Sequence, residues 1–139
     1  MSDSPLESLL GALDKLDLDG VLELMAPDCE LLTVDGRRAD GADAVRELLG
    51  DFVAALRTTA HRVTAQWQQD DVWFAEVEAD YELQDWTQIK ALPRAFVLRT
   101  GPQGISSLHA YGAHERAMGE HAAHLRDDVR IGGRWIAPM

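Results

Sequence analysis

Residues 72 to 83 read Val-Trp-Phe-Ala-Glu-Val-Glu-Ala-Asp-Tyr-Glu-Leu, and their alternation is the clearest pattern in the chain. Apolar side chains occupy every second position from Trp73 to Leu83, and acidic side chains occupy four of the five positions between them. Successive side chains of a strand point to opposite faces of its sheet. The pattern therefore predicts a strand with one buried face and one solvated face.

Further strand patterns flank this stretch. His61 to Gln68 alternates before it and ends at the turn signal Asp70-Asp71. After it we expect a loop over residues 85–93 and a turn over residues 101–104, each followed by a strand. The expected strands form a four-stranded antiparallel meander over residues 61–68, 73–83, 95–100 and 105–114.

Helical patterns precede these strands. Ser4-Pro5-Leu6-Glu7 is a capping box with proline at the first helical position, and leucines follow at helical spacing. A second helix is expected over residues 17–25, ended by Pro27, and a third carries an apolar stripe from Val45 to Leu56. A short strand over residues 29–34 separates them. Because the strands follow the helices as a block, the order predicts an α+β fold with the helices on one face of an antiparallel sheet.

The composition favours one globular domain. Of the 139 residues, 46% are hydrophobic and 27% charged, so the chain can form one core, and we expect residues 1–139 to be a single domain. Residues 115–139 are expected to be a C-terminal extension, in which 116–127 fits a helix and Gly132-Gly133 indicates a hairpin. Cys29 is the only cysteine, which excludes an intrachain disulfide and favours a small buried apolar residue.

The charge distribution limits the kinds of molecule that the protein is expected to bind. The formal net charge is −11, and no cluster of Lys and Arg supplies the basic face that a phosphate backbone needs, so no nucleic acid is expected. The opening Met-Ser-Asp-Ser-Pro lacks the basic and apolar parts of a secretion signal, and no stretch approaches the roughly 18 apolar residues of a membrane span. We therefore expect a cytoplasmic protein with no membrane partner.

The run from Leu18 to Asp28, followed by a short strand and then Gly41-Ala42-Asp43-Ala44-Val45-Arg46, resembles the opening of ketosteroid isomerases, SnoaL-like polyketide cyclases and other nuclear transport factor 2-like proteins. The closing strand from Gly104 to Tyr111 fits as well. The resemblance implies a cystatin-like cone, in which three N-terminal helices pack on a curved antiparallel sheet around a conical pocket. The superfamily contains isomerases, cyclases, dehydratases, epoxide hydrolases and non-catalytic binders, so the function depends on the site.

The catalytic residues of ketosteroid isomerases are not found here. The resemblance places that family's carboxylate base at Thr33, its tyrosine at Leu9 and its protonated acid at Arg94. None of the three matches, so steroid isomerisation by that route is not expected. The epoxide hydrolases of the superfamily use an Asp/Arg/Asp network, and Ala113 stands where an acid often lies.

The alternation of side chains between the two faces of the sheet suggests a different set of site residues. If Trp73 and Tyr81 face the pocket, neighbouring strands point a group of polar and aromatic side chains at the same space, although a single bulge would invert part of this set. The catalytic candidates are His109, His61 and Asp35. The ligand-binding candidates are Arg94, Tyr111, Tyr81, Trp67, Trp73, Phe96 and Thr33.

These residue types suit acid/base chemistry. An imidazole titrates near neutral pH and is suited to proton transfer, so His61 or His109 is a candidate base. Asp35 or a tyrosine could orient it, and Arg94 could bind a carboxylate or enolate oxygen through its planar fork. The alternatives are structural: hydrogen-bonded strand histidines, tyrosines and tryptophans in a core or interface, and an arginine in an ion pair.

Two functions remain open at this point. The first is binding of a small hydrophobic molecule, cyclic or polyketide-like, with cofactor-free acid/base catalysis of the isomerase, cyclase or dehydratase type. The second is a non-catalytic, dimeric binding or interaction domain. No cofactor and no metal are expected in either. A homodimer is expected in both, because Phe74, Val97 and Leu108 alternate opposite to the proposed pocket residues.

Overall fold

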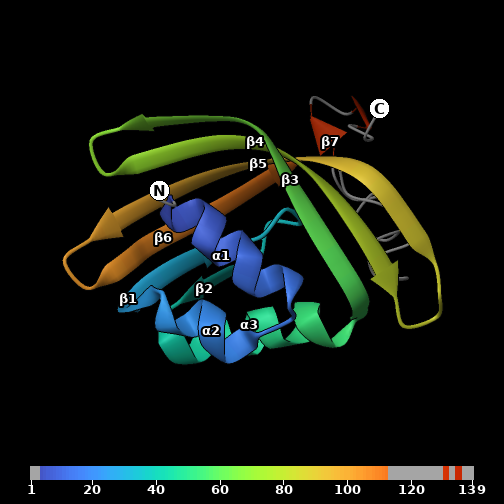
Figure 1. Cartoon of the computed structure of the whole chain (residues 1–139), viewed down its shortest axis with the longest axis horizontal. Coiled ribbons are helices and arrows are strands. Elements are labelled where there is room, and N and C mark those ends of the chain that lie inside the picture. The colour runs from blue at the N-terminus through green and yellow to red at the C-terminus, as the bar shows by residue number, and fades with distance from the viewer. Residues whose placement is uncertain (1–3, 113–129, 132–133, 136–139) are drawn as a thin grey trace.

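The computed structural model describes residues 4–112, 130–131 and 134–135. In this part of the chain, three helices pack against one face of a strongly curved six-stranded sheet (Figure 1). The predicted α+β class, with its helices on one face of a curved sheet, is confirmed. The helices are α1 (Pro5–Asp14), α2 (Leu18–Glu23) and α3 (Ala42–Ala54).

The first two helices begin at side-chain caps, Ser4 for α1 and Asp17 for α2. The Ser4 hydroxyl accepts the backbone N–H of Glu7 at 2.9 Å, as the capping box predicts. The leucine stripe of α1 is buried against the sheet and forms much of the core, together with the fully buried Cys29. The second helix is shorter than predicted. It ends at Glu23, and Pro27 lies inside the following strand instead of ending the helix.

The sheet has the strand order β2-β1-β6-β5-β4-β3. All neighbouring pairs are antiparallel except β1 and β6, which are parallel. The strands are β1 (Met25–Leu32), β2 (Arg38–Asp40), β3 (Leu56–Gln69), β4 (Val72–Leu83), β5 (Gln88–Gly101) and β6 (Gly104–Gly112).

The strand boundaries correct three expectations. The first strand starts at Met25, four residues before the predicted start, and β2 was not predicted. The expected loop over residues 85–93 is mostly strand, because β5 begins at Gln88 and Pro93 pairs with Glu78 of β4. The remaining hairpin is only Gln84 to Thr87, which is within the usual length of such connections.

Two of the register shifts in the sheet change the face on which predicted site residues lie. We call the side of the sheet toward the helices the inner face and the opposite side the outer face. The register of β3 shifts between Val63 and Ala65, so Trp67 pairs with Phe74 on the outer face. The register of β6 shifts at Ser106, so Leu108 faces inward. A bulge opposes two residues to one on the partner strand and so inverts the parity beyond it.

These bulges correct the parity used in the sequence analysis. His109 and Tyr111 were expected on the inner face, but His109 pairs with Val97 and Tyr111 with Ala95 on the outer face. The same reversal removes Leu108 from the expected dimer surface, since its side chain is buried on the inner face. The inner face nevertheless keeps the aromatic and polar residues that β3, β4 and β5 contribute.

The expected C-terminal extension over residues 115–139 and the helix over residues 116–127 lie outside the described residues, except for two short strands. These are β7 (Arg130–Ile131) and β8 (Arg134–Trp135), which pair antiparallel and confirm the hairpin predicted at this point. Among the described residues, no helix has the length and apolar character required to cross a membrane.

Candidate functional site

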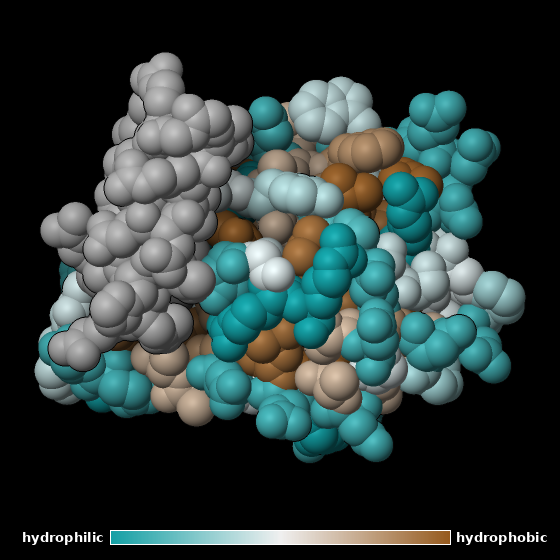
Figure 2. All heavy atoms as spheres, turned by 180° about the vertical axis from the view of Figure 1, so that it is seen from behind, coloured by the Kyte–Doolittle hydropathy of each residue, from teal (hydrophilic) through white to brown (hydrophobic). Residues whose placement is uncertain are grey.

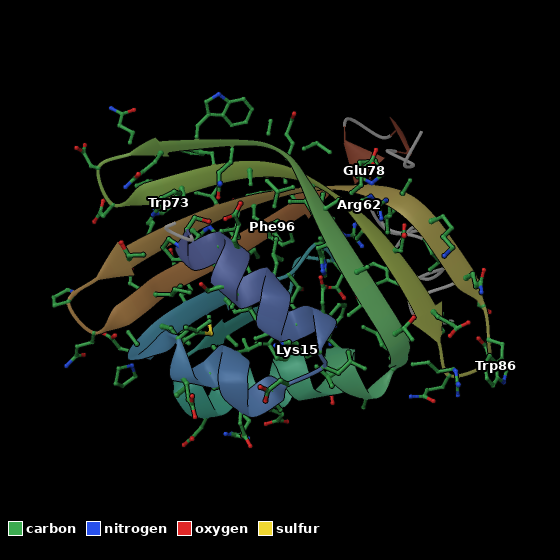
Figure 3. All side chains as sticks on the ribbon, in the orientation of Figure 1. Lys15, Arg62, Trp73, Glu78, Trp86 and Phe96 are labelled. Atoms are coloured by element: carbon green, nitrogen blue, oxygen red, sulfur yellow. The ribbon has the colours of Figure 1, made fainter. Side chains whose placement is uncertain are left out.

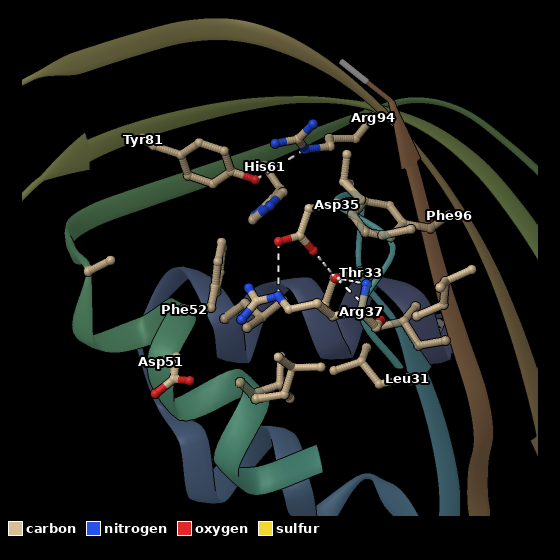
Figure 4. Close-up of a pocket in the computed structure, with 18 residues that line it drawn as sticks. Leu31, Thr33, Asp35, Arg37, Asp51, Phe52, His61, Tyr81, Arg94 and Phe96 are labelled. Atoms are coloured by element: carbon tan, nitrogen blue, oxygen red, sulfur yellow. Dashed lines mark hydrogen bonds and ion pairs between the residues drawn. The ribbon is translucent and has the colours of Figure 1, made fainter. Parts of the chain in front are cut away.

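A cavity of about 380 Å³ lies between the helices and the inner face of the sheet. Most of its wall is apolar, with leucines from α1, α3, β1 and β6, and Phe52 from α3. A concave apolar pocket with a few convergent polar groups is the usual form of a small-molecule site. Six of the residues proposed from the sequence line it (Figure 4): Thr33, Asp35, His61, Tyr81, Arg94 and Phe96.

His61 is held by Asp14, a residue that the sequence analysis did not select. Asp14 is the last residue of α1, and its Oδ1 lies 2.7 Å from Nδ1 of His61. Its Oδ2 accepts the backbone N–H of His61 at 3.1 Å. The side chain of His61 is 2% exposed and that of Asp14 is 29% exposed. One carboxylate therefore fixes both the backbone and the ring of His61.

This contact determines which nitrogen of His61 is available. An ionised carboxylate only accepts hydrogen bonds, so His61 donates from Nδ1. Burial lowers the pKa of His61 from its ordinary value of 6.5, and the hydrogen bond to Asp14 acts in the opposite direction. The imidazole is therefore neutral at pH 7 with an unprotonated Nε2, to which no described residue donates a hydrogen bond. Such an imidazole has the form of a general base.

Tyr81 and Arg94 stand beside His61 on β4 and β5. The ring centres of His61 and Tyr81 are 5.9 Å apart in an edge-to-face contact. Arg94 donates from Nε to the Tyr81 hydroxyl at 3.5 Å, and its guanidinium carbon lies 5.7 Å from the Tyr81 ring centre. Arg94 is 7% exposed. Phenol and guanidinium groups both donate hydrogen bonds, so together they suit an oxygen that gains negative charge.

The turn between β1 and β2 adds a second polar group. The Thr33 hydroxyl donates to one oxygen of Asp35, and Arg37 donates from Nε to the other at 2.9 Å. The Asp35 side chain is only 6% exposed, whereas about half of Arg37 is exposed. The carboxylate therefore forms part of the cavity wall, and its partner Arg37, although half exposed, also lines the cavity (Figure 4).

Three of the proposed site residues lie on the outer face and do not line this cavity. His109 bonds through Nε2 to Glu30 at 2.8 Å, and the Tyr111 hydroxyl lies 3.4 Å from Nδ1 of His109. Trp67 is 55% exposed. The placement of these three residues in the pocket is thus corrected, and the physical reason is the pair of bulges in β3 and β6.

Trp73 has an intermediate position. It lies on the inner face, is half-buried and packs against the main core, but it does not line the cavity. Figure 3 shows Trp73 and Phe96 on the same side of the sheet as the helices, whereas Trp86 lies at the tip of the β4–β5 hairpin. Trp73 therefore contributes to packing beside the site.

Sequence reasoning missed three charged residues of the site: Asp14, Arg37 and Asp51. Asp14 and Asp51 lie in the last turns of α1 and α3, and Arg37 lies in the turn before β2, so strand alternation does not place them in the site. The described residues include no group of three His, Cys, Asp or Glu side chains placed to hold a metal ion. The polar groups of the cavity are suited to contacts with an organic molecule.

Residues 6–124 match the model of the SnoaL-like domain family. Because this match covers most of the chain, the protein belongs to that family. The membership confirms the predicted place in the nuclear transport factor 2-like superfamily. No curated protein matches the chain.

Solved structures share the fold at low sequence identity. A protein with a ketosteroid isomerase-like fold from Catenulispora acidiphila, in complex with trimethylamine, has a TM-score of 0.71 and 18% identity over 80% of this chain and 86% of the other. TerC, co-crystallised with polyporic acid, has a TM-score of 0.68 and 14% identity over 86% and 92%. AclR from Streptomyces galilaeus has a TM-score of 0.68 and 13% identity over 84% and 79%. These likenesses show the fold alone.

Proposed function

We propose that this chain is a cofactor-free acid/base enzyme that moves a proton on a small hydrophobic molecule bound in the cavity. The observation that carries the proposal is the contact between His61 and Asp14, which leaves a neutral, buried imidazole with Nε2 unprotonated. Two proteins of similar fold were crystallised with small organic molecules, trimethylamine and polyporic acid, which supports small-molecule binding by this fold.

The reaction class that fits these groups is proton abstraction from a carbon next to a carbonyl. Nε2 of His61 takes the proton, the C–H electron pair forms a carbon–carbon double bond, and the carbonyl π electrons move to oxygen. Arg94 and Tyr81 donate hydrogen bonds to the resulting enolate oxygen, and Asp14 stabilises the imidazolium. Return of the proton to a second carbon completes an isomerisation. Delivery to a β-hydroxyl, which leaves as water, completes a dehydration.

Deuterium exchange tests this proposal without knowledge of the natural substrate. The bicyclic ketone 2-tetralone has acidic α-hydrogens, and their exchange in D₂O is followed by proton NMR. We expect wild-type protein to exceed the buffer rate and His61→Gln to lower the protein-dependent rate by about 100-fold, which is the usual contribution of a general base. His109→Gln is the matched control, because His109 also bonds to a carboxylate but lies on the outer face. Equal losses in both variants, or no exchange above buffer, would contradict the proposal.

The outer face favours a second role, formation of a homodimer. Trp67, Phe74 and Tyr111 are 55%, 40% and 46% exposed on this face, and Val97 lies between Phe74 and His109 in the strand pairing. From behind, apolar side chains appear between polar ones over the sheet (Figure 2). Exposed aromatic residues are enriched at protein interfaces. We propose that a second copy of the chain covers this face, whether the cavity is catalytic or only binds its ligand.

A further inference from the structure

The backbone of Arg94 is held between two neighbouring strands. It pairs with Val77 of β4 on one side and with Gly112, the last residue of β6, on the other. Arg94 is buried, and its Nε donates to the Tyr81 hydroxyl, as the dashed line in Figure 4 shows. The place of the guanidinium in the cavity therefore depends on the spacing of β4, β5 and β6 at this level.

Gly112 lies closer to β5 than a residue with a side chain could. Its φ angle is +145°, in a region that L-residues with a side chain rarely adopt. A Cβ at this position would lie 2.5 Å from the carbonyl oxygen of Pro93 and 3.2 Å from Cα of Arg94. Both of these are backbone atoms, so rotation of a side chain cannot relieve the clash. The observed approach of β6 to the Pro93–Arg94 segment thus requires glycine.

The segment that Gly112 meets has little freedom to adjust. The ring of Pro93 fixes its φ angle near −65°, so the chain cannot absorb a displacement by rotation about that bond. Gly101, at the opposite end of β5, provides a contrast within the same strand pair. A Cβ at Gly101 would have no neighbour nearer than about 4.0 Å, which is an ordinary contact. Alanine at position 101 is therefore compatible with the structure, and alanine at position 112 is not.

We propose that Gly112 is a positioning residue for Arg94. By bringing the end of β6 against the Pro93–Arg94 segment, it holds the guanidinium beside Tyr81. Gly112 is not among the described residues that line the cavity, so it acts through Arg94. The catalytic consequence of this inference rests on the proposed function, in which Arg94 and Tyr81 donate to the enolate oxygen. The geometric part is independent of any reaction.

NMR of the full chain tests the geometric part. The Nε–H signal of Arg94 is identified by its loss in Arg94→Lys. In Gly112→Ala we expect this signal to shift and its hydrogen to exchange with water at least tenfold faster, because the contact with Tyr81 is lost. Gly101→Ala is the matched control and should leave the signal unchanged. An unchanged Arg94 signal in folded Gly112→Ala would overturn the inference, since it would mean that β6 alone had moved away.

A measurement on wild-type protein tests the same geometry should Gly112→Ala not fold. Nuclear Overhauser effects report hydrogens within about 5 Å of each other. We expect one between an α-hydrogen of Gly112 and the α-hydrogen of Arg94, and a second between the Arg94 Nε–H and the Tyr81 ring. Absence of either would overturn the inference.

Deuterium exchange into 2-tetralone tests the catalytic consequence. Gly112→Ala should lower kcat about tenfold and change KM less than twofold, because the enolate oxygen gains its charge only as the proton leaves. The loss should be smaller than the roughly 100-fold typical of complete removal of an oxyanion donor. Gly101→Ala should keep both constants. A higher KM with unchanged kcat in Gly112→Ala would contradict a role through Arg94.

The two proposals fail in different experiments. Wild-type protein that gives no exchange above buffer, with the expected NMR change in Gly112→Ala, would refute the proposed function and leave the positioning role of Gly112 intact. Exchange by the wild type together with an unchanged Arg94 signal in Gly112→Ala would support the function and refute the positioning role.

Discussion

The carboxylate of Asp14 holds His61 at two points, at ring Nδ1 and at the backbone N–H. The contact joins the end of α1 to the middle of β3, so the packing of the first helix and the orientation of the proposed base depend on the same group. A carboxylate that fixes the tautomer of a catalytic histidine has this role in hydrolase triads. Loss of Asp14 should therefore affect stability and chemistry together.

Asp14→Ala should destabilise the protein. It removes two hydrogen bonds and leaves a buried Nδ1–H without an acceptor, which typically costs about 1–3 kcal/mol. We expect Tm to fall by several degrees in differential scanning calorimetry. Glu30→Ala is the control, because the partner of Glu30, His109, is less deeply buried than His61. Equal decreases in Tm for the two variants would show that the burial of His61 is unimportant.

Acid should weaken both stability and proton transfer through His61. Its pKa is lowered by burial, so below pH 6.5 the unfolded chain binds a proton that the folded chain does not. Stability from this group is therefore complete above pH 6.5 and is lost as the pH falls through the folded pKa. The exchange rate should fall in the same window, since only neutral His61 accepts a proton. Urea titrations of wild type and His61→Gln between pH 5 and pH 8 measure the difference, and parallel curves would contradict it.

Phe74→Glu should separate the proposed dimer into monomers. Phe74 lies on the outer face between Trp67 and Val97 in the strand pairing, and a buried unpaired charge there would oppose association. Wild-type protein should sediment at twice the 15.4 kDa chain mass and the variant at that mass. Trp86→Glu is the control, because Trp86 lies at the hairpin tip and stacks on Arg57. A monomeric wild type at micromolar concentration would refute the dimer.

The ion pair between Arg62 of β3 and Asp80 of β4 allows a direct measurement of a shifted pKa. Arg62 bonds to both Asp80 and Glu78, and the hydrogen bond from Arg62 is the main cause that lowers the pKa of Asp80 to about 2. NMR titration of the wild-type side chain should show this low midpoint. Arg62→Gln should raise the midpoint toward 3.8, the ordinary value for aspartate. A midpoint that the substitution leaves unchanged would assign the shift to the backbone N–H of Ala91 instead.

The sequence was sufficient for the fold because local signals agree with one another. The capping box at Ser4, the leucine stripe behind it and the alternation from Trp73 to Leu83 each indicate one structure, and the packed elements follow these signals. Element ends were less predictable. Pro27 and Pro93 are local breakers by type, yet both lie in strands, where pairing with neighbours outweighs local preference.

The placement of site residues was wrong for those that follow two of the register shifts. His61 precedes the shift between Val63 and Ala65 and lies in the cavity, whereas Trp67 follows that shift and lies outside. His109 and Tyr111 follow the shift in β6. Asp14 could not have been found from spacing, because its contact with His61 joins positions 47 residues apart in the chain. Bulges and long-range contacts are properties of the assembled sheet and leave little trace in a single sequence.

The extra residue at Ser106 has a consequence for how such a site can diversify. Deletion of one residue there would restore regular pairing in β6 and turn the rest of the strand over. His109 and Tyr111 would then point into the cavity, and Leu108 would move to the surface. The loss or gain of one residue in β6 would thus change which polar side chains line the cavity, without any amino-acid substitution.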